Sequence, residues 1–277
     1  MKKKIIIIGK NSFIGSNLFK FLKYKFNTTI YDYQKFLNVS PKLLFDVSYV
    51  INCSSNKKYV NKKYSEKNDF DFQISKKIKD LNCKMIFLST RKIYKIGDNL
   101  NEASKLNPNC NYSKNKLNTE KKLLKDLKNR ILILRISNLI GINKFRNHDK
   151  KIHKTFIDFF LLNIQRGIVF NNGKAYKDFL SIKKFSEIIE KLINKKVVGI
   201  YNVSLGKKVY LNKIINWLNI FNKKEYQCID FPKSYKIECF YLNNDKLMKK
   251  INIKNSLIDL EKDCKAMSKL FFKKKNK

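Results

Sequence analysis

The chain has 277 residues, of which 43% are hydrophobic and only three are prolines, so it can bury a large core and is not a disordered polypeptide. Its longest apolar run near the start, Ile5 to Ile8, is too short for a signal peptide or a membrane span, which predicts a cytoplasmic protein with no membrane partner. The formal net charge is +39, but only five of the 61 basic residues are arginines and the lysines run along the whole chain, so a nucleic-acid partner is not expected.

Cysteines and histidines give no metal-binding pattern. The six cysteines include no Cys-x-x-Cys pair, and the only histidines are His148 and His153. We therefore expect reduced thiols in a reducing compartment and no metal site.

Several short runs rich in isoleucine and valine are expected to form strands that are buried on both faces. Amphipathic helical patterns separate them along the chain, and this alternation predicts an α/β fold with a doubly wound parallel Rossmann sheet. The predicted strands are 4–8, 28–31, 49–53, 85–89 and 131–136, and the predicted helices are 14–24, 69–81 and 112–127.

The pattern becomes less regular after about residue 141. Further helices are expected near 155–165, 184–193 and 211–221. We interpret residues 1–142 as an NAD(P)-binding Rossmann domain and residues 143–277 as a small C-terminal substrate-binding cap, with a segment at about 177–205 returning to the sheet.

The first predicted strand runs into a short loop, Gly9-Lys10-Asn11-Ser12-Phe13-Ile14-Gly15, and then into a helix. Glycine suits a tight turn and lets the backbone approach a pyrophosphate, which the free N–H groups of the helix N-terminus attract. Ser12 replaces the middle glycine of the usual pattern. An ordinary strand–helix turn is the alternative, but the position between a buried strand and a helix favours a dinucleotide loop.

Asp32 closes the second predicted strand. A carboxylate there can accept the hydroxyl groups of an adenosine ribose and repels a 2′-phosphate, which favours NAD. Lys35 lies nearby and keeps NADP possible.

The segment Tyr112-Ser113-Lys114-Asn115-Lys116 places a tyrosine and a lysine on one face of a helix. The Lys116 ammonium favours the ionised Tyr112 phenol, which can exchange a proton with a substrate hydroxyl while hydride moves to or from a nicotinamide. Thr90 ends the fourth predicted strand, where it can hydrogen-bond the substrate oxygen. These three residues are the predicted catalytic set.

The order of such segments resembles the extended short-chain dehydrogenase/reductase family, the NAD-dependent epimerases and dehydratases that modify nucleotide sugars. The resemblance covers nearly the whole chain. It includes Gly9 to Gly15, Asp32, Val50 to Ser55, Asn68, Ser89 to Tyr94, Tyr112 to Lys116, Arg135 to Gly141, Lys177-Asp178-Phe179 and Gly199 to Val203.

The resemblance implies roles for further residues. Lys116 would also bind the nicotinamide ribose, and Asn138 would contact the substrate. Lys177 stands where the family commonly places an arginine on the nucleotide diphosphate, and Arg91 is a further candidate for binding substrate. Candidate cofactor-binding residues are Gly9, Ser12, Phe13, Ile14, Gly15, Asp32, Cys53, Ser54, Lys57, Asn68, Tyr112 and Lys116. A homodimer formed through helices 69–81 and 112–127 is also implied.

Departures from the family pattern reduce the number of reactions that we expect this protein to catalyse. Dehydratases of this family have Asp-Glu after the threonine, where this chain has Arg91-Lys92, so dehydration is not expected. Epimerases that act beside a ketone use a cysteine in this segment and a distant histidine. Lys92 stands in place of that cysteine. His153 lies in roughly the region of that histidine and is considered as a second acid/base, but it is interpreted as a surface residue of the cap. The span between Asp32 and Asp46 also lacks the further strand and helix that are usual in the family.

Three functions remain from these observations. The first is a nucleotide-sugar epimerase that removes and returns a hydride with the Thr-Tyr-Lys set. The second is a nucleotide 4-ketosugar reductase, in which hydride moves one way. The third is a dinucleotide-binding protein without catalysis, which the intact set disfavours.

Overall fold

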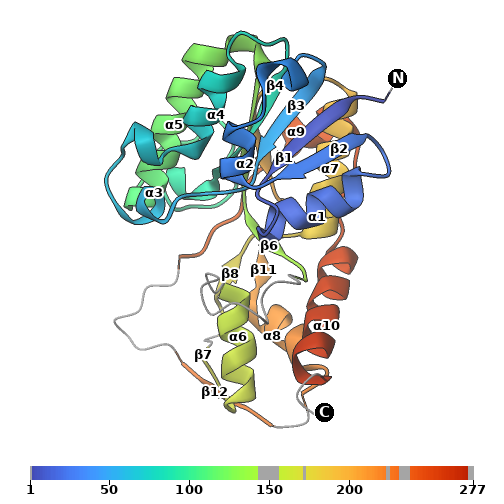
Figure 1. The fold of residues 1–277 in the computed structure, drawn as a ribbon. Helices are drawn as coiled ribbons and strands as arrows, with labels where there is room; N and C mark the ends of the chain where they lie inside the picture. Colours follow the sequence, from blue (N-terminus) through green and yellow to red (C-terminus); the bar gives the residue numbers. More distant parts are fainter. Residues whose placement is uncertain (1, 143–155, 171–172, 223–224, 231–237, 274–277) are drawn as a thin grey trace.

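The structure of the protein is a computed structural model, and it describes residues 2–142, 156–170, 173–222, 225–230 and 238–273. The upper part in Figure 1 holds the central sheet between two layers of helices, and the lower part holds a smaller group of helices and short strands. The chain starts in the upper part, and its last described helix lies in the lower part.

The central sheet has six strands in the order β10-β5-β4-β3-β1-β2, and all neighbouring pairs are parallel. All five predicted strands are present, and the doubly wound parallel Rossmann sheet is confirmed. The strands are β1 (Lys4–Ile8), β2 (Asn27–Tyr31), β3 (Val47–Asn52), β4 (Lys84–Thr90), β5 (Ile131–Ile136) and β10 (Gly199–Val203).

Isoleucines of β1 alternate between two cores because successive strand residues point to opposite faces. Ile5 and Ile7 pack with α1 (Phe13–Leu22), α7 (Ile182–Asn194) and α9 (Asp245–Ile251). Ile6 and Ile8 pack on the opposite face with α4 (Phe70–Ile78) and α5 (Asn111–Leu127). Figure 1 shows the two helical layers on either side of the sheet.

The strand order reverses at β1, which lies between β2 and β3. Connections leave β1 towards one side of the sheet and β3 towards the other, so their carboxyl ends border a crevice. The loop Gly9 to Gly15 leaves β1 at this point. The fold therefore places the predicted dinucleotide loop at the topological switch point.

The short span after β2 forms α2 (Tyr33–Leu37) and a 3-10 turn, η1 (Pro41–Leu44). Phe36 and Leu44 bury their side chains in the core beneath them. The Tyr33 ring stacks on Phe70 of α4, with ring centroids 3.5 Å apart. The span has no further strand to continue the sheet, so β2 forms its edge. The packed side chains of α2 and η1 cover the core in that region.

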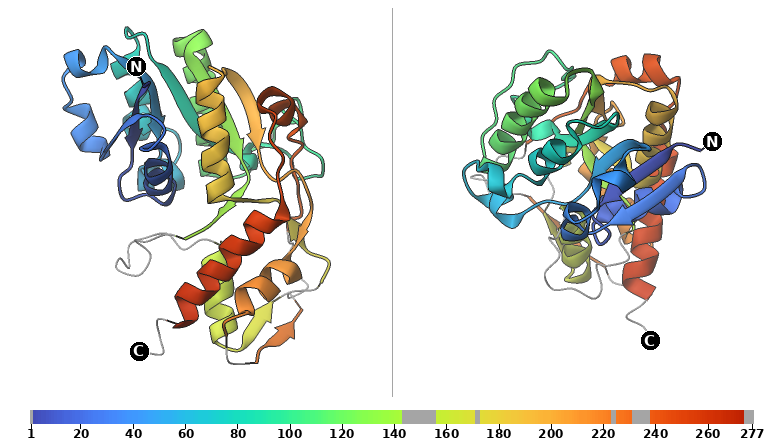
Figure 2. Two further views of the ribbon diagram at one scale, coloured as in Figure 1. Left: turned by 90° about the vertical axis from the view of Figure 1, so that its right-hand side faces the viewer. Right: turned by 45° about the horizontal axis from the view of Figure 1, so that its top comes forward.

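The lower part encloses a separate core, which includes Phe160, Phe179, Ile214 and Leu260. Its long helix α10 crosses beside α8 (Figure 2). The sequence patterns gave no prediction for α9 or α10. The elements are β6 (Asn138–Ile140), α6 (Phe156–Gln165), β7 (Ile168–Phe170), β8 (Tyr176–Lys177), β9 (Phe179–Ser181), β11 (Val209–Tyr210), α8 (Leu211–Asn219), β12 (Gln227–Ile229) and α10 (Leu257–Lys273).

Short strands of the lower part pair in twos: β6 with β9, β8 with β11, and β7 with β12. The remaining short elements are α3 (Lys57–Asn61), η2 (Glu66–Asn68), η3 (Arg91–Ile93) and η4 (Lys128–Arg130).

Across the ranges that the structure describes, no helix combines the length and apolarity needed to cross a bilayer.

Candidate active site

A cavity of about 300 Å³ lies where the carboxyl ends of β4 and β5 face the lower part of the molecule. It joins the start of α1, the end of β4 and the first turn of α5 to α6. Five residues that the sequence singled out line it together: Phe13, Ile14, Thr90, Tyr112 and Asn138.

Gly9 and Gly15 are in close contact with the backbone around them. Gly9 has φ +111°, and a Cβ atom there would lie 3.0 Å from the backbone nitrogen of Ser54. A Cβ atom on Gly15 would clash with the carbonyl oxygen of Gly9. Both positions therefore require glycine, because a side chain would break the turn.

Ser12 is the N-cap of α1. Its Oγ atom accepts a hydrogen bond from the Gly15 N–H at 2.9 Å, while its backbone is extended with φ −80° and ψ 150°. A serine at this position stabilises the helix start because it satisfies one of the unpaired N–H groups. This role explains why serine can replace the middle glycine of the loop.

The three predicted catalytic residues come from β4 and α5. Thr90 is 8% exposed, and its Oγ1 accepts a 3.3 Å hydrogen bond from the backbone N–H of Lys92. Tyr112 is half-buried in the first turn of α5, and Lys116, one turn further on, is 6% exposed. Thr90 and Tyr112 reach the same cavity.

The Lys116 ammonium lies in a cage of aromatic and acidic groups. Its Nζ atom is 3.4 Å from Oδ2 of Asp71 and 4.4 Å from the centre of the Phe87 ring. Burial acts to lower the pKa of Lys116, but the charges of Asp71, Tyr112 and Asp69 outweigh it and raise that pKa. The site therefore favours a charged ammonium next to Tyr112.

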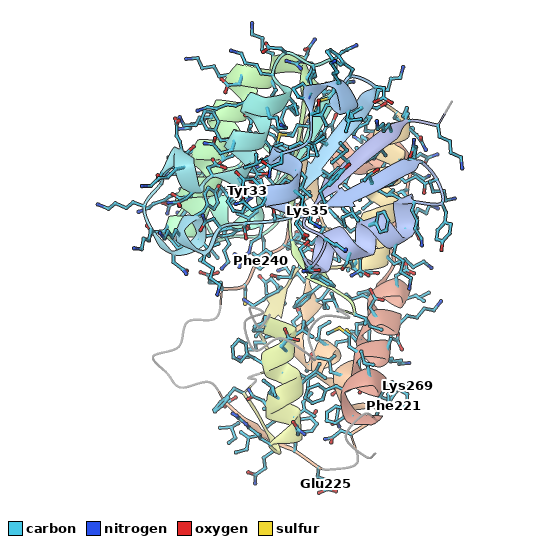
Figure 3. The ribbon with its side chains drawn as sticks, in the orientation of Figure 1. Tyr33, Lys35, Phe221, Glu225, Phe240 and Lys269 are labelled. Carbon is cyan, nitrogen blue, oxygen red and sulfur yellow. The ribbon has the colours of Figure 1, made fainter. Side chains whose placement is uncertain are left out.

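A second group of charges lies between β4 and the lower part. Arg91 Nη2 is 3.1 Å from Oε2 of Glu238, and its guanidinium is 3.8 Å from the centre of the Phe240 ring. The Lys177 Nζ donates a 2.8 Å hydrogen bond to the backbone oxygen of Glu238. Figure 3 places Phe240 at the junction of the two parts.

Among the described residues, this group holds one buried cation, Arg91, one half-buried cation, Lys177, and one carboxylate. Burial, together with the charge of Arg91, lowers the pKa of Lys177 to about 8. An anion that enters beside Arg91 and Lys177 would balance the excess positive charge. Asn138 lies on the cavity side, and its side-chain amide donates to the backbone oxygen of Asp178 at 3.0 Å.

The other predicted residues lie around the switch point. Asp32 follows β2 and makes no side-chain hydrogen bond that caps α2. Cys53 and Ser54 pack against Gly9, whereas Lys57 is exposed at the start of α3. The Asn68 side-chain oxygen accepts a 3.3 Å hydrogen bond from Asn56. None of these residues lines the cavity that holds Thr90 and Tyr112.

No three side chains of His, Cys, Asp or Glu converge as a metal site within the described ranges. Both histidines of the chain, including the considered acid/base His153, lie outside those ranges.

Residues 5–204 match the NAD-dependent epimerase/dehydratase family. The chain belongs to this family. The membership predicted from the sequence is therefore confirmed, and the match starts within β1 and ends just after β10.

Solved structures of similar fold include two nucleotide-sugar epimerases and a protein solved with NADPH. UDP-N-acetylglucosamine 4-epimerase from Methanobrevibacter ruminantium M1, solved with UDP-N-acetylmuramic acid, is 20% identical with a TM-score of 0.79, covering 99% of this chain and 100% of that one. UDP-glucuronic acid 4-epimerase from Bacillus cereus, solved with NAD, is 17% identical with a TM-score of 0.77, covering 97% and 99%. RMD from Pseudomonas aeruginosa, solved with NADPH, is 15% identical with a TM-score of 0.74, covering 98% and 99%. No curated protein sequence matches the chain.

Two features of this epimerase/dehydratase-family chain fit a bound dinucleotide. The glycine turn runs directly into the N-terminus of α1, and a helix N-terminus attracts the negative charge of a pyrophosphate. Ser137 lines the cavity, and its buried hydroxyl has no hydrogen-bond partner among the described residues, so it can bind a polar group such as a carboxamide. The sequence patterns gave no role to Ser137 or to Asp71, because neither residue belongs to a local motif that indicates a site.

Proposed function

We propose that the protein is an NAD(P)-dependent epimerase of nucleotide sugars that uses Thr90, Tyr112 and Lys116. The observation that carries this proposal is the shared cavity: Thr90 and Tyr112 face it together with the N-terminal residues of α1. The charged Lys116 lies one helical turn behind Tyr112. A protein that only binds a dinucleotide would not need a phenol beside a buried ammonium.

Each residue has a defined part in this chemistry. The Thr90 hydroxyl donates a hydrogen bond to the reacting sugar oxygen, and the Tyr112 oxygen takes the proton of that sugar hydroxyl. Before that transfer Tyr112 is a phenolate, and the Lys116 ammonium stabilises its negative charge. NAD(P), when bound, supplies the hydride acceptor. Epimerisation then requires the ketone to turn and be reduced on its opposite face, with Tyr112 returning the proton.

The dinucleotide would lie across the switch point. Gly9, Ser12, Phe13, Ile14 and Gly15 would face its pyrophosphate, and Asp32 would accept the adenosine ribose hydroxyls and so favour NAD. Lys35 is exposed in the same turn, so a 2′-phosphate could also be neutralised there. The other residues proposed to contact the cofactor are Cys53, Ser54, Lys57, Asn68, Tyr112 and Lys116.

Arg91, Asn138 and Lys177 are proposed to bind the substrate. Arg91 is a buried cation and Lys177 a half-buried one, and among the described residues Glu238 is the carboxylate whose charge acts on both. A nucleotide diphosphate supplies the missing negative charge. Lysine at position 177 keeps the charge but gives one point contact rather than a bidentate one.

A turnover assay separates this proposal from a 4-ketosugar reductase. Purified protein is incubated with candidate nucleotide sugars and a trace of NAD, and products are separated by chromatography while absorbance of the reduced cofactor is followed. An epimerase forms the epimer with no lasting change in reduced cofactor. Stoichiometric loss of NADH or NADPH with a 4-ketosugar would instead identify a reductase.

A further inference from the structure

Asp71 is a buried carboxylate that the chemistry proposed above does not use. It lies in α4, is 4% exposed, and points at α5, the helix that carries Tyr112 and Lys116, rather than at solvent. Its Oδ2 atom lies 3.4 Å from Nζ of Lys116. Burying an ion pair of this kind is costly, so it calls for a reason beyond stability.

The other oxygen of Asp71 is tied to the end of β3. Asn52 donates a hydrogen bond from Nδ2 to Asp71 Oδ1 at 2.9 Å. The Asn52 side-chain oxygen in turn accepts hydrogen bonds from the backbone N–H and the hydroxyl of Ser54. Ser54 is the residue against which Gly9 packs. A continuous set of contacts therefore links the glycine turn to Lys116 through Asn52 and Asp71.

We propose that Asp71 is a positioning residue: its carboxylate fixes the Lys116 ammonium in register with the dinucleotide loop and beside Tyr112. The inference rests on the proposed function for its catalytic consequence. Both carboxylate oxygens are engaged, one by the ammonium and one by Asn52, so the ammonium has a defined location even before a ligand binds.

The titratable groups that face Lys116 come from four elements. Asp71 lies on α4 and Asp69 caps its start, Tyr112 lies on α5, Tyr59 on α3, and Cys53 follows β3. Asp69 is the natural comparison because it is also buried, at the N-cap of α4, but its oxygens accept hydrogen bonds from Tyr64, Phe72 and Thr119. Only Asp71 contacts the ammonium directly among the carboxylates of the described residues. Burial raises the pKa of Asp71 to about 6, so it is ionised at neutral pH.

The first test follows the ammonium itself. Protein labelled with nitrogen-15 at lysine is titrated, and the Lys116 signal is identified by its absence from Lys116→Met. In wild type the midpoint should lie above the ordinary value of about 10.4 in spite of burial. Asp71→Asn keeps the shape and removes the charge, and should lower the midpoint by at least about one pH unit.

Asp69→Asn is the matched control and should shift the midpoint less, because its direct partners are not Lys116. A wild-type midpoint below about 10.4, or equal midpoints in wild type and Asp71→Asn, would overturn the inference. A wild-type midpoint below that value overturns the inference even if Asp71→Asn does not fold.

The second test measures turnover. Asp71→Asn should lower kcat about tenfold to hundredfold with little change in KM, and should move the alkaline limb of the pH profile to lower pH. Asp71→Glu, which keeps the charge, should recover part of the rate. An alkaline limb that does not move would count against Asp71. Absence of turnover in the wild type would refute the proposed function alone, because the Lys116 titration would still report on Asp71.

Discussion

Tyr112 lies both at the cavity and close to a buried positive charge. The first turn of α5 brings its side chain to the cavity beside Thr90, and Lys116 lies on the same helical face one turn later. Lys116 is buried, so its charge acts through a medium of low dielectric constant rather than through water. A phenol in this position can serve as an acid and as a base in turn.

Replacing Tyr112 by phenylalanine should therefore abolish most turnover while leaving the fold intact. Loss of a positioned acid/base costs about hundredfold or more in kcat. Tyr24→Phe is the control, since Tyr24 is 70% exposed and lies outside the cavity. Steady-state kinetics of both variants check the prediction, and equal rates in Tyr112→Phe and wild type would remove Tyr112 from the mechanism.

We expect substrate binding to depend on pH because of the lowered pKa of Lys177. Its pKa is lowered to about 8, so it is charged below that pH and becomes neutral above it. Affinity for a nucleoside diphosphate such as UDP should fall as the pH rises through about 8, by up to tenfold per unit. Calorimetric titrations at several pH values measure this.

Lys177→Arg provides the comparison for that experiment, because a guanidinium stays charged throughout the range. Its affinity for the diphosphate should stay level where that of the wild type declines. A wild-type affinity that does not change between about pH 7 and about pH 9 would show that Lys177 does not bind the anion.

At the scale of elements, the junction of β1 and α1 depends on two glycines and a serine cap. Ser12 holds the helix start, and Gly9 and Gly15 let two stretches of backbone touch. Because Ser54 packs on the same turn, β3 is also part of the junction. Any added side chain would push these three segments apart.

Gly15→Ala should destabilise the protein by about 1 to 3 kcal/mol, because its methyl group would meet the Gly9 carbonyl. It should also weaken NAD binding. Gly97→Ala is the matched control: its nearest neighbour would lie at an ordinary 3.5 Å, so the change in free energy of unfolding should stay within about 0.5 kcal/mol. Urea unfolding of both variants measures the difference, and equal stabilities would contradict the packing argument.

At the scale of the whole molecule, the large positive net charge should affect the formation of a homodimer. The exposed residues of α4 and α5 include Lys76, Lys114, Lys121 and Lys125, with Leu124 the large apolar side chain among them at 38% exposure. A homodimer through these helices is the arrangement that the family resemblance implies. Bringing two such faces together in a chain of formal net charge +39 costs electrostatic energy that salt reduces.

We therefore expect dimerisation to strengthen as ionic strength rises. Sedimentation measurements at low and high salt should show the dimer fraction increasing with salt. Lys121→Glu, which places an acid on that face, should form dimers at lower salt than the wild type. A dimer fraction that salt and Lys121→Glu both leave unchanged would place the interface elsewhere.

The sequence by itself determined the Rossmann sheet, its first five strands and the family, because buried parallel strands and a glycine turn impose local patterns. It also placed Tyr112 and Lys116 on one helix, because helical periodicity is a local pattern too. Only the tertiary structure brought Asp71 to Lys116, Glu238 to Arg91 and Ser137 to the cavity. These contacts join residues distant in the chain, and no local period encodes which buried polar groups will meet. The helices α9 and α10 also escaped prediction, since their apolar residues are recognisable as core only once their packing partners are in place.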